Sequence, residues 1–332
     1  MNRYRSVEPL AGVLITERCG ALSSEIGSVA VALAGTLAKR LGARVLRVCD
    51  VSEDPLAFCA PLLPDGKSAL HRFLTDGKEL IRSLTDEACQ GFLLTDDEQL
   101  AAQWGRRRLL VRDAFESDGC QQSELTLAAA AGLLDIQADA GMPPLPLPGY
   151  QMAYSAGLAA FTALQACLFA EQVHGTQQDA EVSALDVAQW VNWKHQLSDI
   201  SSLFETGLDR AEEWRVFPCR DGFIAAIFRD RDMPNVAQLA GMTRLAEPDF
   251  SSNKLRAKNY KELHALLAES MRDKSKAEIL GEAIRLKLPY AEVCTPAQLH
   301  ADPQFVERAF IQDGMPRAPI VWQSAGNGGM KT

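Results

Sequence analysis

The chain has 332 residues, and its 34 Lys and Arg against 43 Asp and Glu give a net charge of −9 at pH 7. This acidic balance without a basic tract argues against nucleic acid as a partner, because phosphates are neutralised by clustered basic side chains. Hydrophobic residues make up 47% and charged residues 23%. These proportions are those of a globular protein with a real core, and they exclude a disordered, collagenous or disulfide-scaffold chain.

The cysteines and the first residues indicate the cellular compartment of the protein. The eight cysteines are scattered, without a CxxC pair or a histidine at ligand spacing, so we expect no metal site. The first five residues are mostly polar, so we expect no signal peptide at this end of the chain. We therefore expect a cytoplasmic protein with reduced cysteines.

Residues 9–50 are typical of a βαβ unit. A strand is expected at 13–16, a helix of small residues at 27–41 ended by Gly42, and a second strand at 44–48. This order predicts a doubly wound α/β domain. No GxGxxG follows the first strand, so a dinucleotide fingerprint is absent.

The pattern then repeats, with a helix expected at 78–84 and strands at 91–94 and 108–111. Residues 142–149 hold four prolines and predict an extended connector. It leads to an Ala-rich apolar stretch, 154–173, that polar residues interrupt. A membrane span needs about 20 strongly apolar residues, so we expect a buried helix and no membrane partner. The start of such a helix suits an anionic group.

The second half of the chain has its own pattern. A domain boundary is expected near 200–215, followed by a hairpin at 221–228 and helices over 232–284. A strand is expected at 288–293, and Thr295 with the following proline opens a helix.

No reaction follows from the residues alone. There is no GxSxG, and His195 is either a base or, as we prefer, a surface or core histidine. The basic residues of 39–47 and 106–108 either meet phosphates or, as we prefer, form a solvated helix end that favours positive charge.

Several segments together resemble the family III CoA-transferases, the carnitine-dehydratase and bile-acid-inducible F group, which share their fold with the alpha-methylacyl-CoA racemases. The matching segments, in the family's order, are 9–13, 41–48, 131–133, 156–158, 177–186, 220–225, 288–293 and 299–305. The resemblance implies a Rossmann-like large domain of residues 1–204 with 299–332 and a smaller α/β domain of 205–298. It also implies an interlocked dimer, a homodimer or a pair with a related subunit.

The family's chemistry depends on one aspartate, whose carboxylate attacks an acyl-CoA thioester and forms a mixed anhydride as CoA leaves. Counting back from Asp186, or four residues before Gly157, places that position at Ala153. The His-Asp pair of the racemases falls on Ser123 and Glu124. The resemblance therefore implies a site that lacks the nucleophile and keeps one carboxylate.

Two hypotheses follow for the site. In the first, the chain acts on an acyl-CoA or a small carboxylic acid by an altered mechanism, with Glu124, Tyr154 and Ser155 as candidate catalytic residues. The alternative for Glu124 is a helix cap or a surface acid. In the second, the chain is catalytically inactive and serves as a binding or partner subunit.

Coenzyme A is the expected ligand, as a substrate in the first hypothesis or as a bound group in the second, where another acyl group or a partner chain is the alternative. The family's Asn-Arg-Gly-Lys-Arg-Ser loop, which helps to hold CoA, is reduced here to residues 74–78. The candidate CoA-binding residues are Arg40, Arg47 and Lys78.

Overall fold

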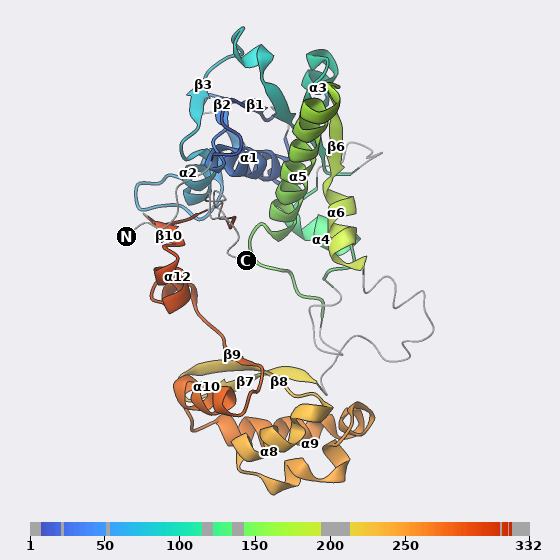
Figure 1. Ribbon diagram of the computed structural model, residues 1–332, viewed down its shortest axis with the longest axis vertical. Coiled ribbons are helices and arrows are strands. Elements are labelled where there is room, and N and C mark those ends of the chain that lie inside the picture. The colour runs from blue at the N-terminus through green and yellow to red at the C-terminus, as the bar shows by residue number, and fades with distance from the viewer. Residues whose placement is uncertain are drawn as a thin grey trace, which may run out of the picture. The chain divides into compact units, whose positions relative to one another are not determined.

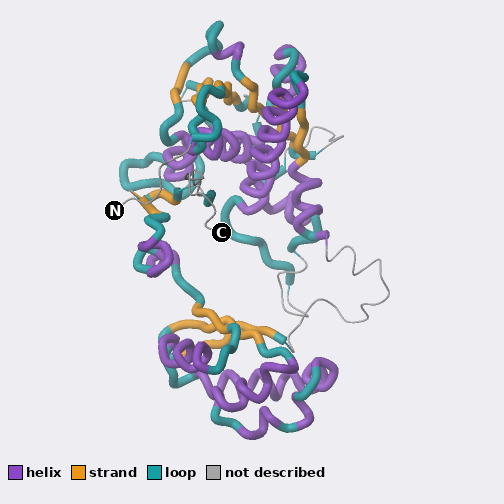
Figure 2. Tube along the Cα trace, in the orientation of Figure 1, coloured by secondary structure: helices purple, strands orange, loops and turns teal. Residues whose placement is uncertain are grey.

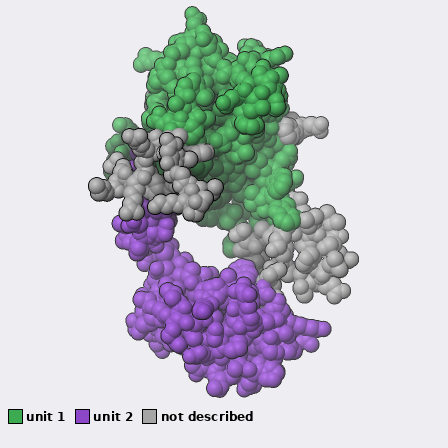
Figure 3. Space-filling model, in the orientation of Figure 1, with its two compact units in different colours: residues 1–203, 317–332 green, residues 204–316 purple. Residues whose placement is uncertain are grey.

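The computed structural model describes residues 8–20, 23–50, 54–114, 122–134, 143–193, 213–312, 314–317 and 319–320 (Figure 1). Its helices and strands are coloured in Figure 2. The chain divides into two compact units, Met1–Leu203 with Arg317–Thr332 and Phe204–Pro316, called here the large and the small unit (Figure 3). The domain boundaries that the family resemblance implies, 1–204 with 299–332 and 205–298, describe a chain within an interlocked dimer, and they stay a prediction. His195 lies outside the described residues.

The large unit is built on a parallel sheet of six strands (Figure 1). The order is β3-β2-β1-β4-β5-β6, in which the direction of winding reverses between β1 and β4. The strands are β1 (Leu14–Arg18), β2 (Arg44–Val48), β3 (Glu79–Ile81), β4 (Phe92–Thr95), β5 (Arg108–Arg112) and β6 (Ala180–Ser183). The predicted Rossmann-like α/β fold is confirmed.

Helices connect these strands. They are α1 (Glu25–Arg40), α2 (Ala69–Thr75), α3 (Glu98–Trp104), α4 (Glu124–Ala130), α5 (Gln151–His174) and α6 (Ala184–Val191), with the 3-10 turns η1 (Pro55–Phe58) and η2 (Ala88–Gln90). The Ser24 hydroxyl caps α1 by accepting the Gly27 N–H at 2.9 Å. Ala, Val, Leu and Gly fill most of α1, which is buried along nearly its whole length against strands and α5.

Helix α5 packs closely on α1. A Cβ at Gly157 would lie 3.0 Å from the carbonyl oxygen of Ala30 and from the Leu33 side chain, so the glycine permits this approach. By length and composition α5 is also apolar enough to cross a membrane. Its inner side, which includes Phe161 and Leu164, nevertheless lies in the core of the large unit. The helix expected at 154–173 is therefore a core helix.

The small unit has an antiparallel sheet in the order β7-β8-β9 and its own core. The strands and helices are β7 (Trp214–Cys219), β8 (Gly222–Ile227), β9 (Tyr290–Glu292), α8 (Met233–Ala240), α9 (Asn253–Met271), α10 (Lys276–Arg285), α11 (Pro296–Leu299) and α12 (Pro303–Glu307). Short 3-10 turns and a hairpin complete it: η4 (Asp230–Asp232), η5 (Thr243–Ala246), η6 (Pro248–Phe250), β10 (Ile311–Gln312) and β11 (Met315–Pro316). The predicted hairpin at 221–228 is confirmed, and so is the Thr295 cap.

The helix expected at 78–84 is wrong, because residues 79–81 form β3. Parallel pairing places Glu79 beside Leu46 and Ile81 beside Val48. The Lys78 side chain is buried next to Glu17 and fixes the start of the strand. Strand pairing and this ion pair outweigh the local helix propensity of the segment, in which Lys, Glu, Leu and Arg are good helix formers.

Candidate active site

The starts of α1 and α5 meet at the carboxyl edge of the large sheet. Helix α1 follows β1, and α5 leads into the parallel strand β6, so both helices begin at that edge. The Tyr150 hydroxyl, just before α5, donates to Glu25 Oε1 in the first turn of α1 at 2.7 Å. Ligands of doubly wound folds bind outside the carboxyl ends of the strands, which makes this edge the candidate site.

Glu124 caps the start of α5 from a neighbouring helix. Its Oε1 accepts the N–H of Ala153 at 2.7 Å, and its Oε2 accepts the N–H of Met152 at 3.0 Å. A carboxylate here satisfies two free helix donors and complements the helix dipole. Burial raises the pKa of Glu124; the two N–H bonds oppose this rise, and the charge of Glu25 adds to it. Glu124 is thus a cap, and it caps α5 rather than its own helix.

The other predicted positions lie in the first turn of α5. The Ala153 methyl group is fully buried. The Ser155 hydroxyl donates to the Gln151 carbonyl at 2.8 Å and so is engaged within the helix. The Tyr154 ring lies 6.3 Å from that of Tyr150, and its pKa is raised by burial and then by the charge of Glu124. The structure therefore brings Glu124 to the start of α5 near Tyr154, whereas Ser155 bonds only within the helix; the catalytic roles of all three stay a prediction.

A thiol that the sequence did not single out lies at the same edge. Cys59 follows η1, and its Sγ is 3.4 Å from the Pro55 carbonyl oxygen and 3.9 Å from Glu25 Oε1. No local pattern marks this position, because its neighbours Glu25 and Tyr150 are remote in sequence.

Two predicted CoA contacts, Arg47 and Lys78, belong to a buried ion network. Both cations bind Glu17, with Lys78 Nζ 2.6 Å from Glu17 Oε2. Arg47 also binds Asp54 at 2.8 Å, and His71 lies 3.4 Å from the same carboxylate. Burial opposes ionisation of Asp54, yet the bonds from His71 and Arg47 lower its pKa overall. The two positive charges are therefore neutralised inside the protein.

Arg40 lies apart from that network, in the last turn of α1 and so at the opposite edge of the sheet. Its guanidinium carbon is 5.4 Å from the centre of the Phe73 ring. Contacts of Arg40, Arg47 and Lys78 with CoA stay a prediction.

Asp96 was not expected from the sequence. It follows β4 at the winding reversal, and its Oδ1 accepts the Gly20 N–H at 2.8 Å. Its Oδ2 is buried, has no hydrogen-bond partner among the residues that the structure describes, and would lie 2.7 Å from a Cβ at Gly27 in α1. Burial raises the pKa of Asp96 to about 6. The chain's own carboxylate thus occupies the start of α1, where related folds hold a phosphate.

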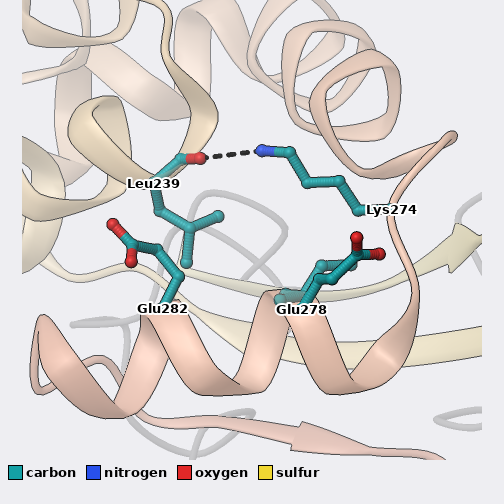
Figure 4. A pocket seen from close by; sticks show the side chains of 5 residues that line it. Leu239, Lys274, Glu278 and Glu282 are labelled. Carbon is teal, nitrogen blue, oxygen red and sulfur yellow. Dashed lines mark hydrogen bonds between the residues drawn. The ribbon is translucent and has the colours of Figure 1, made fainter.

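Two cavities lie away from this edge. One of about 790 Å³ is at the opposite edge of the large sheet, between the start of β1 and the second half of α5. One of about 330 Å³ is in the small unit, where Lys274 Nζ donates to the Leu239 carbonyl at 3.0 Å beside Glu278 and Glu282 (Figure 4). In the described part of the chain, no group of three or more His, Cys, Asp or Glu side chains is placed to hold a metal ion.

The strand order defines a Rossmann-like α/β protein, and the convergent helix starts mark a candidate site at the carboxyl edge of its sheet. The sequence profile of CoA-transferase family III matches residues 118–321, and the chain belongs to this family. The resemblance inferred from the sequence is thereby confirmed.

Solved structures share the fold. A CAIB/BAIF family protein from Brucella suis is 18% identical, with a TM-score of 0.79 over 96% of this chain and 93% of that one. Rv3272 from Mycobacterium tuberculosis, in its orthorhombic form, is 19% identical, with a TM-score of 0.75 over 96% and 94%. A comparison with curated proteins gives no match.

Proposed function

We propose that this family III member acts on an acyl-CoA thioester at the start of α5 without forming an aspartyl anhydride. The family's substrates, CoA thioesters and carboxylic acids, supply the substrate class. The observation that carries the proposal is the pairing of a buried methyl group at Ala153 with a carboxylate, Glu124, bound to the N–H of the same residue. A methyl group cannot attack a carbonyl carbon.

Glu124 is proposed as a base that removes a proton next to the thioester carbonyl. A carboxylate offers about four lone-pair sites, so the bonds to Met152 and Ala153 leave acceptor capacity. Burial raises its pKa towards the range in which general bases work. Tyr154 and Ser155, in the same turn, are proposed to line the acyl group.

A catalytically inactive binding or partner subunit is the second candidate. It is favoured by the engagement of both oxygens of Glu124 and by the internal pairing of Arg47 and Lys78. In this case an acyl-CoA or carboxylic acid is held without being converted.

Binding is tested first, by calorimetric titration with CoA and with acetyl-CoA. Heat of binding supports an acyl-CoA function of either kind. No binding at millimolar concentrations overturns the first candidate and leaves the inactive partner subunit.

Turnover separates the two candidates. With propionyl-CoA in deuterium oxide, a base at Glu124 is expected to exchange the hydrogens next to the carbonyl, and mass spectrometry measures the deuterium gained. Glu124→Gln is expected to slow exchange by about 100-fold or more, whereas an inactive subunit gives no exchange in either form.

The assignment of Ala153 has its own test. If it marks the family's nucleophile, Ala153→Asp is expected to gain CoA transfer from acetyl-CoA to propionate, measured by chromatography of the products. Ala153→Asn, which has the same size and no nucleophile, is the matched control. Equal activity in both variants contradicts the assignment.

A further inference from the structure

Three side chains at the junction of α1 and α5 have no part in the chemistry proposed above. Cys59 Sγ and the Tyr150 hydroxyl both lie against one oxygen, Glu25 Oε1, at 3.9 and 2.7 Å. All three belong to the large unit. Cys59 is partly exposed, in contrast to the buried Cys167.

This arrangement has the form of an activated nucleophile. A thiol beside a base, which is itself oriented by a third group, is the usual sign of nucleophilic catalysis. Tyr150 directly precedes α5, three residues before Ala153, so this member of the cluster lies at the start of the helix that carries Ala153. Glu25 is the first residue of α1, whose positive end favours negative charge nearby.

We propose that Cys59 is the nucleophile that receives the acyl group from the thioester, with Glu25 as its base and Tyr150 positioning Glu25. The proposal rests on the acyl-CoA function above and names the group that replaces the family's carboxylate.

The step balances without a further reactant. Cys59 Sγ bonds to the carbonyl carbon, and the bond from that carbon to the CoA sulfur breaks. The thiol proton passes to Glu25 and from there to the departing CoA sulfur. The products are an acyl thioester on Cys59 and free CoA, so one thioester replaces another.

The electrostatics explain why a base is needed. Burial raises the pKa of the Cys59 thiol, which is therefore protonated at rest, while the thiolate is the reactive form. Burial and Glu25 also raise the pKa of Tyr150, which keeps its proton and holds the carboxylate by donating to it.

The test uses the full chain with acetyl-CoA, succinyl-CoA and octanoyl-CoA. Intact-mass spectrometry is expected to show one added acyl group with at least one of them, together with an equal amount of free CoA. Neutral hydroxylamine should remove the group, and peptide mapping of the unsubstituted chain should place it on Cys59. The mapping needs no variant, so it does not depend on how a substituted chain folds.

Variants then assign the roles. Cys59→Ser is expected to abolish the adduct, and Glu25→Gln to slow its formation by about 100-fold. Tyr150→Phe is expected to slow it less and to change its dependence on pH, because Glu25 loses the donor that orients it. Cys89→Ser, at an exposed cysteine elsewhere in the large unit, is the matched control and should leave the rate unchanged.

Two results overturn the proposal while the acyl-CoA function stands: a bound acyl-CoA that leaves no adduct with any of the three probes, or an adduct that maps to another cysteine. Absence of binding in the calorimetric titration overturns the function itself and this inference with it.

Discussion

Glu17 lies in the interior of the large unit between two cations, Arg47 and Lys78, all three almost inaccessible to solvent. Removing one member of a buried ion pair leaves an uncompensated charge and costs about 3–5 kcal/mol. We expect Glu17→Gln to lower the free energy of unfolding by that amount, measured by urea denaturation. The loss of stability comes from the uncompensated buried charge and is expected in the absence of any ligand.

A matched control for Glu17 lies at the surface. Glu79 binds Arg44 between the neighbouring strands β2 and β3, where both side chains are about half exposed. Exposed pairs contribute little, so Glu79→Gln should hardly change the urea midpoint. Equal losses in the two variants would show that burial is not what makes Glu17 important.

Asp96 predicts a dependence of stability on pH. Its pKa is raised from 3.8 to about 6, so the folded chain binds this proton more tightly than the unfolded chain. The free energy of unfolding therefore falls as pH rises from about 4 to 6, because Asp96 ionises more easily in the unfolded chain. Above that range the buried charge lowers it by about 2–3 kcal/mol. Asp96→Asn removes the charge.

The measurement is the free energy of unfolding of Asp96→Asn and of the unsubstituted chain at about pH 4 and pH 7. We expect the difference between them to favour Asn more at pH 7. A difference independent of pH would mean that Asp96 does not titrate in this range.

Among the helices, the contact of α1 with α5 depends on Gly157. A Cβ there would lie 3.0 Å from Ala30 O, and a backbone oxygen cannot move away cheaply. Gly157→Ala is therefore expected to lower the free energy of unfolding by about 1–3 kcal/mol. Gly281 in α10 has open space around its Cβ position, so Gly281→Ala should stabilise by about 0.5–1 kcal/mol. Thermal unfolding of both variants checks the opposite signs, and equal signs would contradict this account of the packing.

Local signals in the sequence predicted most helices and strands. A helix cap, a proline or a regular spacing of apolar residues determines the backbone conformation within a few residues of itself. The Thr295 cap and the extended connector before α5 are of this kind. The prediction of a helix at 78–84 was wrong because β2, the strand that pairs with this segment, is remote in sequence.

The candidate site was predicted only in part, because it too depends on contacts between residues remote in sequence. The family resemblance located Glu124 and the start of α5, whereas the bond between them joins residues 29 positions apart. The pairing of Arg47 with Glu17 and the approach of Cys59 to Glu25 depend on the assembled sheet. No pattern in the sequence distinguishes such contacts from a solvated surface.

For the whole molecule, each unit has a core of its own, yet many large apolar side chains remain exposed. On α6 and just beyond it, Trp190 is 76% and Trp193 52% exposed. Two large exposed aromatic side chains three residues apart are unusual for a surface that stays in solvent. These side chains support the proposal of a homodimer, with a related subunit as the alternative partner.

The mass in solution tests the homodimer. Light scattering is expected to give twice the 36.2 kDa of the chain. Trp190→Asp is expected to weaken association by about 30-fold, the effect of losing about 2 kcal/mol at a buried aromatic anchor. Trp190→Phe, which keeps an apolar ring, should weaken it much less. A mass of 36.2 kDa for the unsubstituted chain at every concentration would contradict the homodimer and leave the related subunit as the partner to seek.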